Sequence, residues 1–202
     1  SSTFWRGDGT WVAAGGDLSF GGDTFGADKT IGSNDAYALS FETDGNVAMK
    51  IDATGQITKP LQPAFCAYNV AAQNNIAGGA TISFDTEVFD QNADYNNSTY
   101  TFTAPVTGRY CLIFAVRILN LTSNLEWVYV RTGTSNANYD TAIWDTRVFD
   151  ADASYWHFNQ TIFTDMDASD TSTITYQSVG TSATADIAGG RPQTQFSGYL
   201  VC

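Results

Sequence analysis

Carboxylates are the most numerous side chains in this sequence that could do chemistry. The chain carries 21 Asp and Glu against 9 Lys and Arg, a formal net charge of −12. Glycoside hydrolysis needs two carboxyl groups, and Asp85, Glu87 and Asp90, or Asp165 and Asp167, could supply them. No spacing separates these residues from ordinary strand-end and turn aspartates, and neither a nucleophile motif nor a phosphate-binding loop is present. We therefore expect no catalytic residues and no enzymatic activity.

Calcium binding is the second use that clustered carboxylates could have. Hard cations favour carboxylate and carbonyl oxygens, and Asp150-Ala151-Asp152 brings two carboxylates together among small polar residues. Solvated turn aspartates are the alternative interpretation, since the sequence gives no ligand count. No cofactor is certain, and calcium is the one ion that the sequence suggests.

Histidine and cysteine complete the set of chemically active residues. The single histidine, His157, lies in an aromatic stretch where strand alternation puts it opposite Trp156 and Phe158, so a structural or surface role is expected. Cys66, Cys111 and Cys202 are widely spaced and form no zinc pattern with one histidine. An odd number of cysteines also argues against a scaffold built on disulfides.

The acidic balance limits the partners of the chain. A net charge of −12 disfavours nucleic acid and anionic membranes as partners of a broad charged face. No apolar run is long enough to span a bilayer, and no signal peptide is evident. Because the chain does not begin with Met, we expect residue 1 to be an artificial boundary or a cleavage point.

Composition and the spacing of turn residues indicate an all-β protein. Aromatic residues make up 14% of the chain and Gly occurs 18 times, with many Thr and Val residues and only four prolines. From residue 61 onward, short runs between turn residues predict a sandwich without helices. The expected strands are 64–70, 80–89, 99–103, 109–119, 125–131, 141–149, 155–164, 171–179 and 195–201.

Residues 1–60 have a different organisation. Asp44-Gly45 separates two alternating runs, which predicts a β-hairpin. Two or three such strands are not stable alone, so burial against other chains would be needed, or an ordinary hairpin packs on the following domain. Pro60 and Pro63 stiffen the junction, which divides the chain into residues 1–60 and 61–202.

Several short motifs follow the junction. They are Ala64-Phe65-Cys66-Ala67, Ile82-Ser83-Phe84-Asp85, Phe102-Thr103-Ala104-Pro105-Val106 with Gly108, Tyr110 and Phe114, Met166–Thr171, and Phe196–Val201. Together they resemble the complement C1q-like globular domain, a relative of the tumour necrosis factor fold, and they stand in the order of that family, with Ser169 where the family usually has Gly. The resemblance implies a jelly-roll head over residues 61–202 and assembly as a homotrimer.

Two segments of the N-terminal part also carry a resemblance. Residues 4–11, Phe-Trp-Arg-Gly-Asp-Gly-Thr-Trp, are similar to a segment that recurs in bacteriophage tail fibres, and residues 35–57 are similar to the β-stalk modules of these fibres. Arg6-Gly7-Asp8 could instead be an integrin-binding tripeptide. The resemblance implies a short trimeric β-stalk that continues into the rest of the fibre on its N-terminal side. It also implies a place at the distal end of a virion tail fibre. There the chain would attach, without catalysis, to a host receptor that we expect to be a polysaccharide.

The family's strand arrangement predicts which residues meet the receptor. It puts the last strand antiparallel to the first, so Cys202 lies at the base with the stalk. Residues 120–124, 150–154 and 180–195 then form the tip, while the places of 69–79 and 90–97 stay open. The candidate receptor-binding residues are Asp150, Asp152, Arg191, Asp186 and Tyr155, and exposed Trp144, Tyr155 or Trp156 could stack on a sugar ring.

The same arrangement places all three cysteines near the base. We expect them to be free thiols, because phage fibres assemble in a reducing cytoplasm.

Two other functions remain open. The chain could be a secreted C1q-like lectin or structural head of a bacterial or animal protein, with glycans on the sequons at Asn96, Asn97, Asn120 and Asn159. It could also be a tail enzyme that depolymerises host polysaccharide. The module at residues 28–58 favours the tail fibre over both.

Overall fold

The computed structural model describes residues 3–5, 7, 9, 11–13, 26–180 and 184–202, and the regular secondary structure of these residues is almost entirely β-strand. The chain divides into two compact units, residues 1–39 with 51–56 and residues 40–50 with 57–202. No helix in the described part of the chain has the length and apolarity to cross a membrane.

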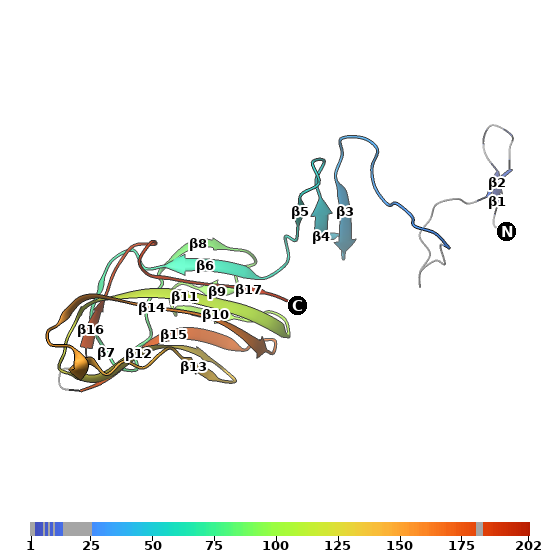
Figure 1. Cartoon of the computed structure of the whole chain (residues 1–202). Helices are drawn as coiled ribbons and strands as arrows, with labels where there is room; N and C mark the ends of the chain where they lie inside the picture. The colour runs from blue at the N-terminus through green and yellow to red at the C-terminus, as the bar shows by residue number, and fades with distance from the viewer. Residues whose placement is uncertain (1–2, 6, 8, 10, 14–25, 181–183) are drawn as a thin grey trace. The chain divides into compact units, whose positions relative to one another are not determined.

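Two antiparallel sheets form the sandwich of the second unit (Figure 1). The first sheet has the order β7 (Gln73–Ala77), β16 (Thr184–Ile187), β11 (Gly108–Leu121), β17 (Gln195–Leu200), β6 (Ala64–Tyr68) and β8 (Thr86–Asp90), with β14 (Ala153–Met166) on the other edge of β11. The second sheet has the order β13 (Asn138–Asp140), β12 (Leu125–Thr134), β15 (Thr171–Gly180), β10 (Thr101–Thr103) and β9 (Tyr95–Asn96). This is the predicted all-β jelly-roll sandwich.

Strand alternation builds the core between the sheets. Successive inward residues of β11 are fully buried, and the largest of them are Tyr110, Leu112 and Phe114. Phe65 stacks on Phe102 with ring centroids 4.7 Å apart. Phe196 of β17 meets Phe65 edge-on with ring centroids 4.9 Å apart. Aromatic pairs add to the stabilisation that burial itself provides, so β6, β10 and β17 contribute to one aromatic cluster.

The Pro105 turn and the Ser169 turn hold each other at one end of the sandwich. The backbone N–H of Ser169 donates to the carbonyl of Ala104 at 2.7 Å, and that of Ala104 donates to Asp170 at 2.8 Å. The hydroxyl of Tyr110 donates to the carbonyl of Val106 at 2.7 Å. Ser169 has φ of 79°, in the left-handed region that favours glycine, which explains why Gly is usual there in the family that the motif resembles.

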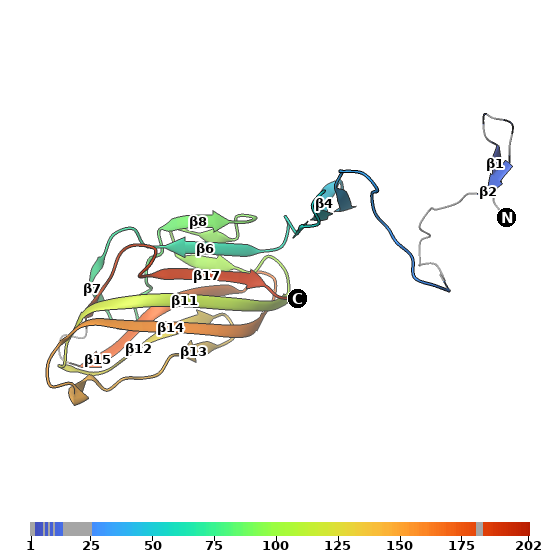
Figure 2. The same cartoon turned by 45° about the horizontal axis from the view of Figure 1, so that its top comes forward.

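The chain enters and leaves the sandwich at this same end, which we call the base. β6 and β17 are antiparallel neighbours, as expected, and Figure 2 shows them beside β11 and β14. The side-chain amide of Gln62 donates to Leu200 at 2.7 Å, and that of Gln91 donates to the carbonyls of Lys59 at 2.8 Å and Gln62 at 2.7 Å. The connector is therefore fastened to the head from residue 59 onward.

Two small sheets precede the sandwich in the chain. β1 (Thr3–Trp5) pairs with β2 (Trp11–Ala13), and β3 (Leu39–Thr43), β4 (Asn46–Ile51) and β5 (Ile57–Thr58) form a three-stranded sheet. Asp44 and Gly45 have φ of 51° and 72°, so the predicted hairpin turn is confirmed. Arg6 and Asp8 of the tripeptide lie outside the described residues.

The structure departs from the strand predictions in several places. Residues 141–149 form no strand: Trp144 makes one isolated bridge to Val128, and a 3₁₀ helix, η1 (Thr146–Val148), follows because the Asp145 side chain accepts from the backbone of Arg147. The expected strand at 80–89 begins only at Thr86. Two short strands, β7 and β16, lie where loops were expected and pair with each other, so only the fold reveals them.

Candidate functional site

The tip of the sandwich, opposite the base, is where the predicted receptor-binding residues were expected. The end of β11, the start of β12 and the segment from η1 to β14 meet there. Oδ1 of Asp152 accepts from the backbone N–H of Ser123 at 2.8 Å and from its hydroxyl at 2.9 Å. These hydrogen bonds lower the pKa of Asp152. Asp152 therefore ties two tip loops together, while Asp150 is exposed beside it.

Tyr155 is the most accessible aromatic candidate near the tip. Its side chain is 68% exposed, and the guanidinium carbon of Arg117 lies 5.8 Å from its ring centroid, a cation–π contact. These two residues line a cavity of about 300 Å³ together with Trp156 and His157. Nε2 of His157 lies 3.1 Å from the carbonyl of Gln193, consistent with the structural role that its position predicted.

The remaining two candidates, Asp186 and Arg191, lie on a strand and on the loop that follows it. Asp186 belongs to β16, and its Oδ1 accepts from the backbone of Asn75 at 2.8 Å. Its register partner Leu119 also pairs with Tyr155 on the opposite side, so Asp186 and Tyr155 share the tip end of β11. Arg191 is exposed on the loop between β16 and β17. Gly190 of this loop is hydrogen-bonded to Asn69, and the carbonyl of Gln193 lies 3.1 Å from Nε2 of His157. Asp152 and Asp186 therefore have structural partners, while Asp150, Tyr155 and Arg191 are exposed.

Binding of a calcium ion would need several oxygen ligands close together. Among the described residues, no group of three or more His, Cys, Asp or Glu side chains could hold a metal ion. With Oδ1 of Asp152 already bound to Ser123, calcium at Asp150 and Asp152 stays a prediction.

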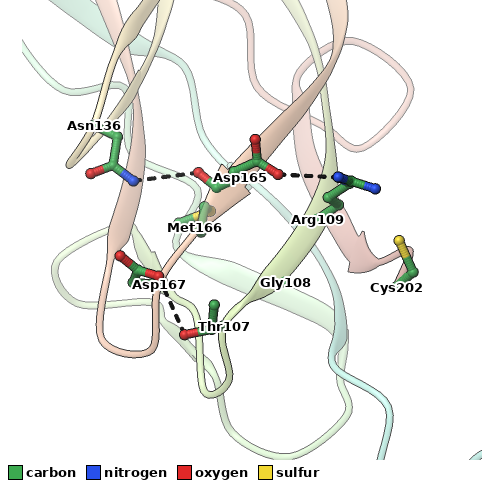
Figure 3. Close-up of a pocket in the computed structure, with 8 residues that line it drawn as sticks. All are labelled: Thr107, Gly108, Arg109, Asn136, Asp165, Met166, Asp167 and Cys202. Atoms are coloured by element: carbon green, nitrogen blue, oxygen red, sulfur yellow. Dashed lines mark hydrogen bonds and ion pairs between the residues drawn. The ribbon is translucent and has the colours of Figure 1, made fainter.

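The carboxylates considered for hydrolysis have separate structural partners. Figure 3 shows a cavity of about 360 Å³ at the base, where Asp165 and Asp167 point to different neighbours. Asp165 pairs with Nε of Arg109 at 3.3 Å, with both side chains mostly exposed, and Asp167 accepts from the hydroxyl of Thr107 at 3.4 Å. An exposed ion pair of this kind contributes little to stability.

The second carboxylate set is equally structural. Asp85 accepts from the backbone of Val70 at 3.1 Å, and Asp90 accepts from the backbones of Asp94 at 3.1 Å and Tyr95 at 2.9 Å. These contacts organise the loops at residues 69–79 and 90–97. Neither set presents two convergent carboxyl groups.

Three exposed aromatic side chains lie on the outer face of the first sheet. Phe163, Cys111 and Tyr199 are register neighbours across β14, β11 and β17. Phe163 is 66% exposed and Tyr199 is 44% exposed, and Phe89 of β8 is 50% exposed on the same sheet. The sequence carried a signal for this face, because Cys111 and Ile113 alternate with the core residues of β11.

Comparison with known proteins identifies the type of domain. The C1q domain model matches residues 64–201. The globular domain of zebrafish complement 1qA protein superimposes with a TM-score of 0.54 at 16% identity and covers 70% of this chain and 98% of that chain. Eiger TNF from S. frugiperda superimposes with a TM-score of 0.51 at 8% identity, covering 70% and 93%.

These structural matches establish a shared fold at identities too low to carry function. No curated protein sequence matches the chain.

Proposed function

The chain belongs to the C1q domain family, and we propose that it is the receptor-binding distal part of a bacteriophage tail fibre. C1q and tumour necrosis factor domains are non-enzymatic and typically trimerise. The proposed activity is therefore attachment: a homotrimeric head binds a polysaccharide of the host surface. The N-terminal side continues into the rest of the fibre on the virion.

The observation that carries this proposal is the three-stranded sheet before the head. Phe41 and Ile57 of this sheet are 43% and 61% exposed, and Tyr37, just before the sheet, is 74% exposed. Apolar side chains on strands this short find no burial within one chain. Three copies wound together would bury them, as the resemblance of residues 35–57 to phage β-stalk modules implies.

The apolar outer face of the first sheet supports trimeric assembly of the head. Phe163, Tyr199 and Phe89 expose aromatic surface on one side of the sandwich, and exposed apolar patches commonly mark interfaces. Packing three copies through this face would leave the tip and the second sheet accessible.

Attachment by such a head works through multivalency. Three heads per fibre, and several fibres per virion, convert weak single contacts into stable adsorption because later contacts form at high effective concentration. The exposed tip residues Asp150 and Tyr155 remain candidates for these contacts, whereas Asp152 and Asp186 already have structural partners.

Adsorption to cells tests the proposal. The fluorescently labelled chain should bind saturably to at least one strain in a panel of bacteria, and periodate oxidation of the cell-surface glycans should abolish binding. Antibodies raised against the chain should label the ends of tail fibres on virions. Binding to no bacterial strain, together with binding to animal or soluble glycans, would support a secreted lectin instead.

A further inference from the structure

We propose that the outer face of the second sheet carries a binding site for a neutral oligosaccharide. The site would consist of an aromatic platform, Trp127 with Tyr129, and an adjoining polar groove. This inference rests on the proposed function of glycan attachment and locates the sugar on the side of the head, away from the tip.

Strand alternation turns the platform residues outward. In β12, Val128 and Val130 are fully buried in the core, so Trp127, Tyr129 and Arg131 lie on the opposite face. The rings of Trp127 and Tyr129 stack with centroids 5.4 Å apart and an interplanar angle of 25°. Trp127 is partly exposed whereas Tyr129 is 7% exposed. The more exposed Trp127 ring therefore stacks on the largely buried Tyr129 ring.

Arg131 extends this row and is fixed in place. Its guanidinium lies 5.5 Å from the centroid of the Tyr129 ring and donates to the Tyr129 hydroxyl at 2.8 Å. It also binds both carboxylate oxygens of Asp140, at 2.6 and 3.2 Å. A bidentate pair has a defined geometry, so the surface offers planar polar groups at set positions beside the rings.

A groove of about 290 Å³ continues from Arg131 toward the base. It is hollow at Gly133, which has no side chain between its register partners Asn138 and Thr173. Hydroxyl and amide groups line it and can each donate and accept hydrogen bonds. The lining residues are Arg131, Gly133, Thr134, Ser135, Asn138, Thr171, Thr173, Thr175 and Gln177.

These features match the chemistry of a sugar chain. The apolar face of a pyranose can rest on an aromatic ring, while its hydroxyls require partners that both donate and accept. Asp140 neutralises Arg131, and the chain carries a net charge of −12. A neutral oligosaccharide therefore suits the groove better than an acidic one.

The position of the platform and the groove keeps both accessible in the assembly. They lie on the second sheet, opposite the exposed aromatic side chains of the first sheet that we assign to trimer contacts. A trimer would thus present three such sites around its sides, which fits the multivalent mechanism.

Glycan binding by the full chain tests the inference. The probe is an array of neutral and acidic oligosaccharides, followed by titration of the bound sugars. We compare the wild type with Trp127→Ala, with the double variant Thr173→Val/Thr175→Val, and with Asp150→Ala at the tip. The valines keep the volume and strand preference of threonine, so this variant remains informative if removal of Trp127 disturbs folding. Thermal melting checks each variant.

We expect binding to neutral sugars, with Kd raised at least about tenfold in Trp127→Ala and in the double threonine variant; a tenfold change corresponds to about 1.4 kcal/mol, the scale of one lost hydrogen bond or stacking contact. Loss of binding only in Asp150→Ala would overturn the lateral site and leave attachment intact. Binding restricted to acidic sugars, or adsorption to cells without glycan binding, would also overturn it. Absence of both glycan binding and adsorption would overturn the proposed function as well.

Discussion

Asp152 joins two tip loops through a single carboxylate oxygen, which accepts from the backbone and the hydroxyl of Ser123. A residue that appeared to be a free receptor contact thus has a structural role. Asp150, two positions earlier, is exposed and accepts no hydrogen bond in the described part of the structure. The two carboxylates, equivalent in the sequence, are therefore distinguishable by experiment.

We predict that Asp152→Ala lowers Tm in a pH-dependent way. Hydrogen bonds from Ser123 lower the pKa of Asp152 in the folded state, so its contribution is present above the unfolded-state pKa of about 3.9 and is lost as the pH falls through the folded value. The Tm difference from wild type should be largest near pH 7 and shrink below pH of about 4. Asp150→Ala is the control and should melt like the wild type throughout; a constant difference for Asp152→Ala would refute the ionic contribution.

The thiols should differ in reactivity. All three cysteines are unpaired; Cys66 and Cys111 are buried, whereas Cys202 is exposed. Burial raises the pKa of Cys66, which further reduces its thiolate fraction. We expect one rapidly titrating thiol per chain in native protein and three after denaturation, with Cys202→Ser removing the rapid one. Fewer than three in denatured protein would reveal a disulfide.

At the scale of elements, β17 is an inner strand of the first sheet, hydrogen-bonded to β6 on one side and β11 on the other. Its Gly198 passes close to the core on both sides: an added Cβ would lie 2.7 Å from Leu112 Cδ2 and 2.9 Å from Phe65 Cε1. The close approach of these strands therefore requires glycine.

We predict that Gly198→Ala destabilises the head by about 1–3 kcal/mol, the usual cost of overpacking a core. Urea unfolding of the chain measures this as a lower midpoint. Gly133→Ala is the matched control, because its Cβ would lie 3.4 Å from the nearest atom, Asn138 Oδ1. Equal midpoints for the two variants would show that the core accommodates the methyl group.

At the scale of the whole molecule, one sandwich has two unlike outer faces. The first sheet exposes aromatic side chains such as Phe163 and Tyr199, while the second sheet presents polar groups around Arg131. This asymmetry suits an assembly that buries the first face and uses the second.

We predict that Phe163→Asp converts the trimer to a monomer. Its side chain is 66% exposed in the single chain, so a charge there should leave the fold intact but be costly inside an interface. Light scattering with circular dichroism measures both mass and folding. Val148→Asp, at a 70% exposed residue of η1, is the control and should remain trimeric. A folded monomeric wild type, or a trimeric Phe163→Asp, would contradict this interface.

The sequence by itself determined the sandwich and most of its strands. Strand alternation and turn residues are local signals, so β11 with its two apolar faces and the Asp44-Gly45 turn could be predicted from nearby residues.

Only the tertiary structure decided which distant groups meet. Hydrogen-bond partners such as Asp152 and Ser123, or Asp186 and Asn75, follow from loop paths that no local pattern encodes. β16 exists because β7 and β11 supply its neighbours. The outward platform of Trp127 and Tyr129 likewise depends on which face of β12 meets the core. Pairing between strands far apart in the chain selects these arrangements, and that selection arises only when the whole core closes.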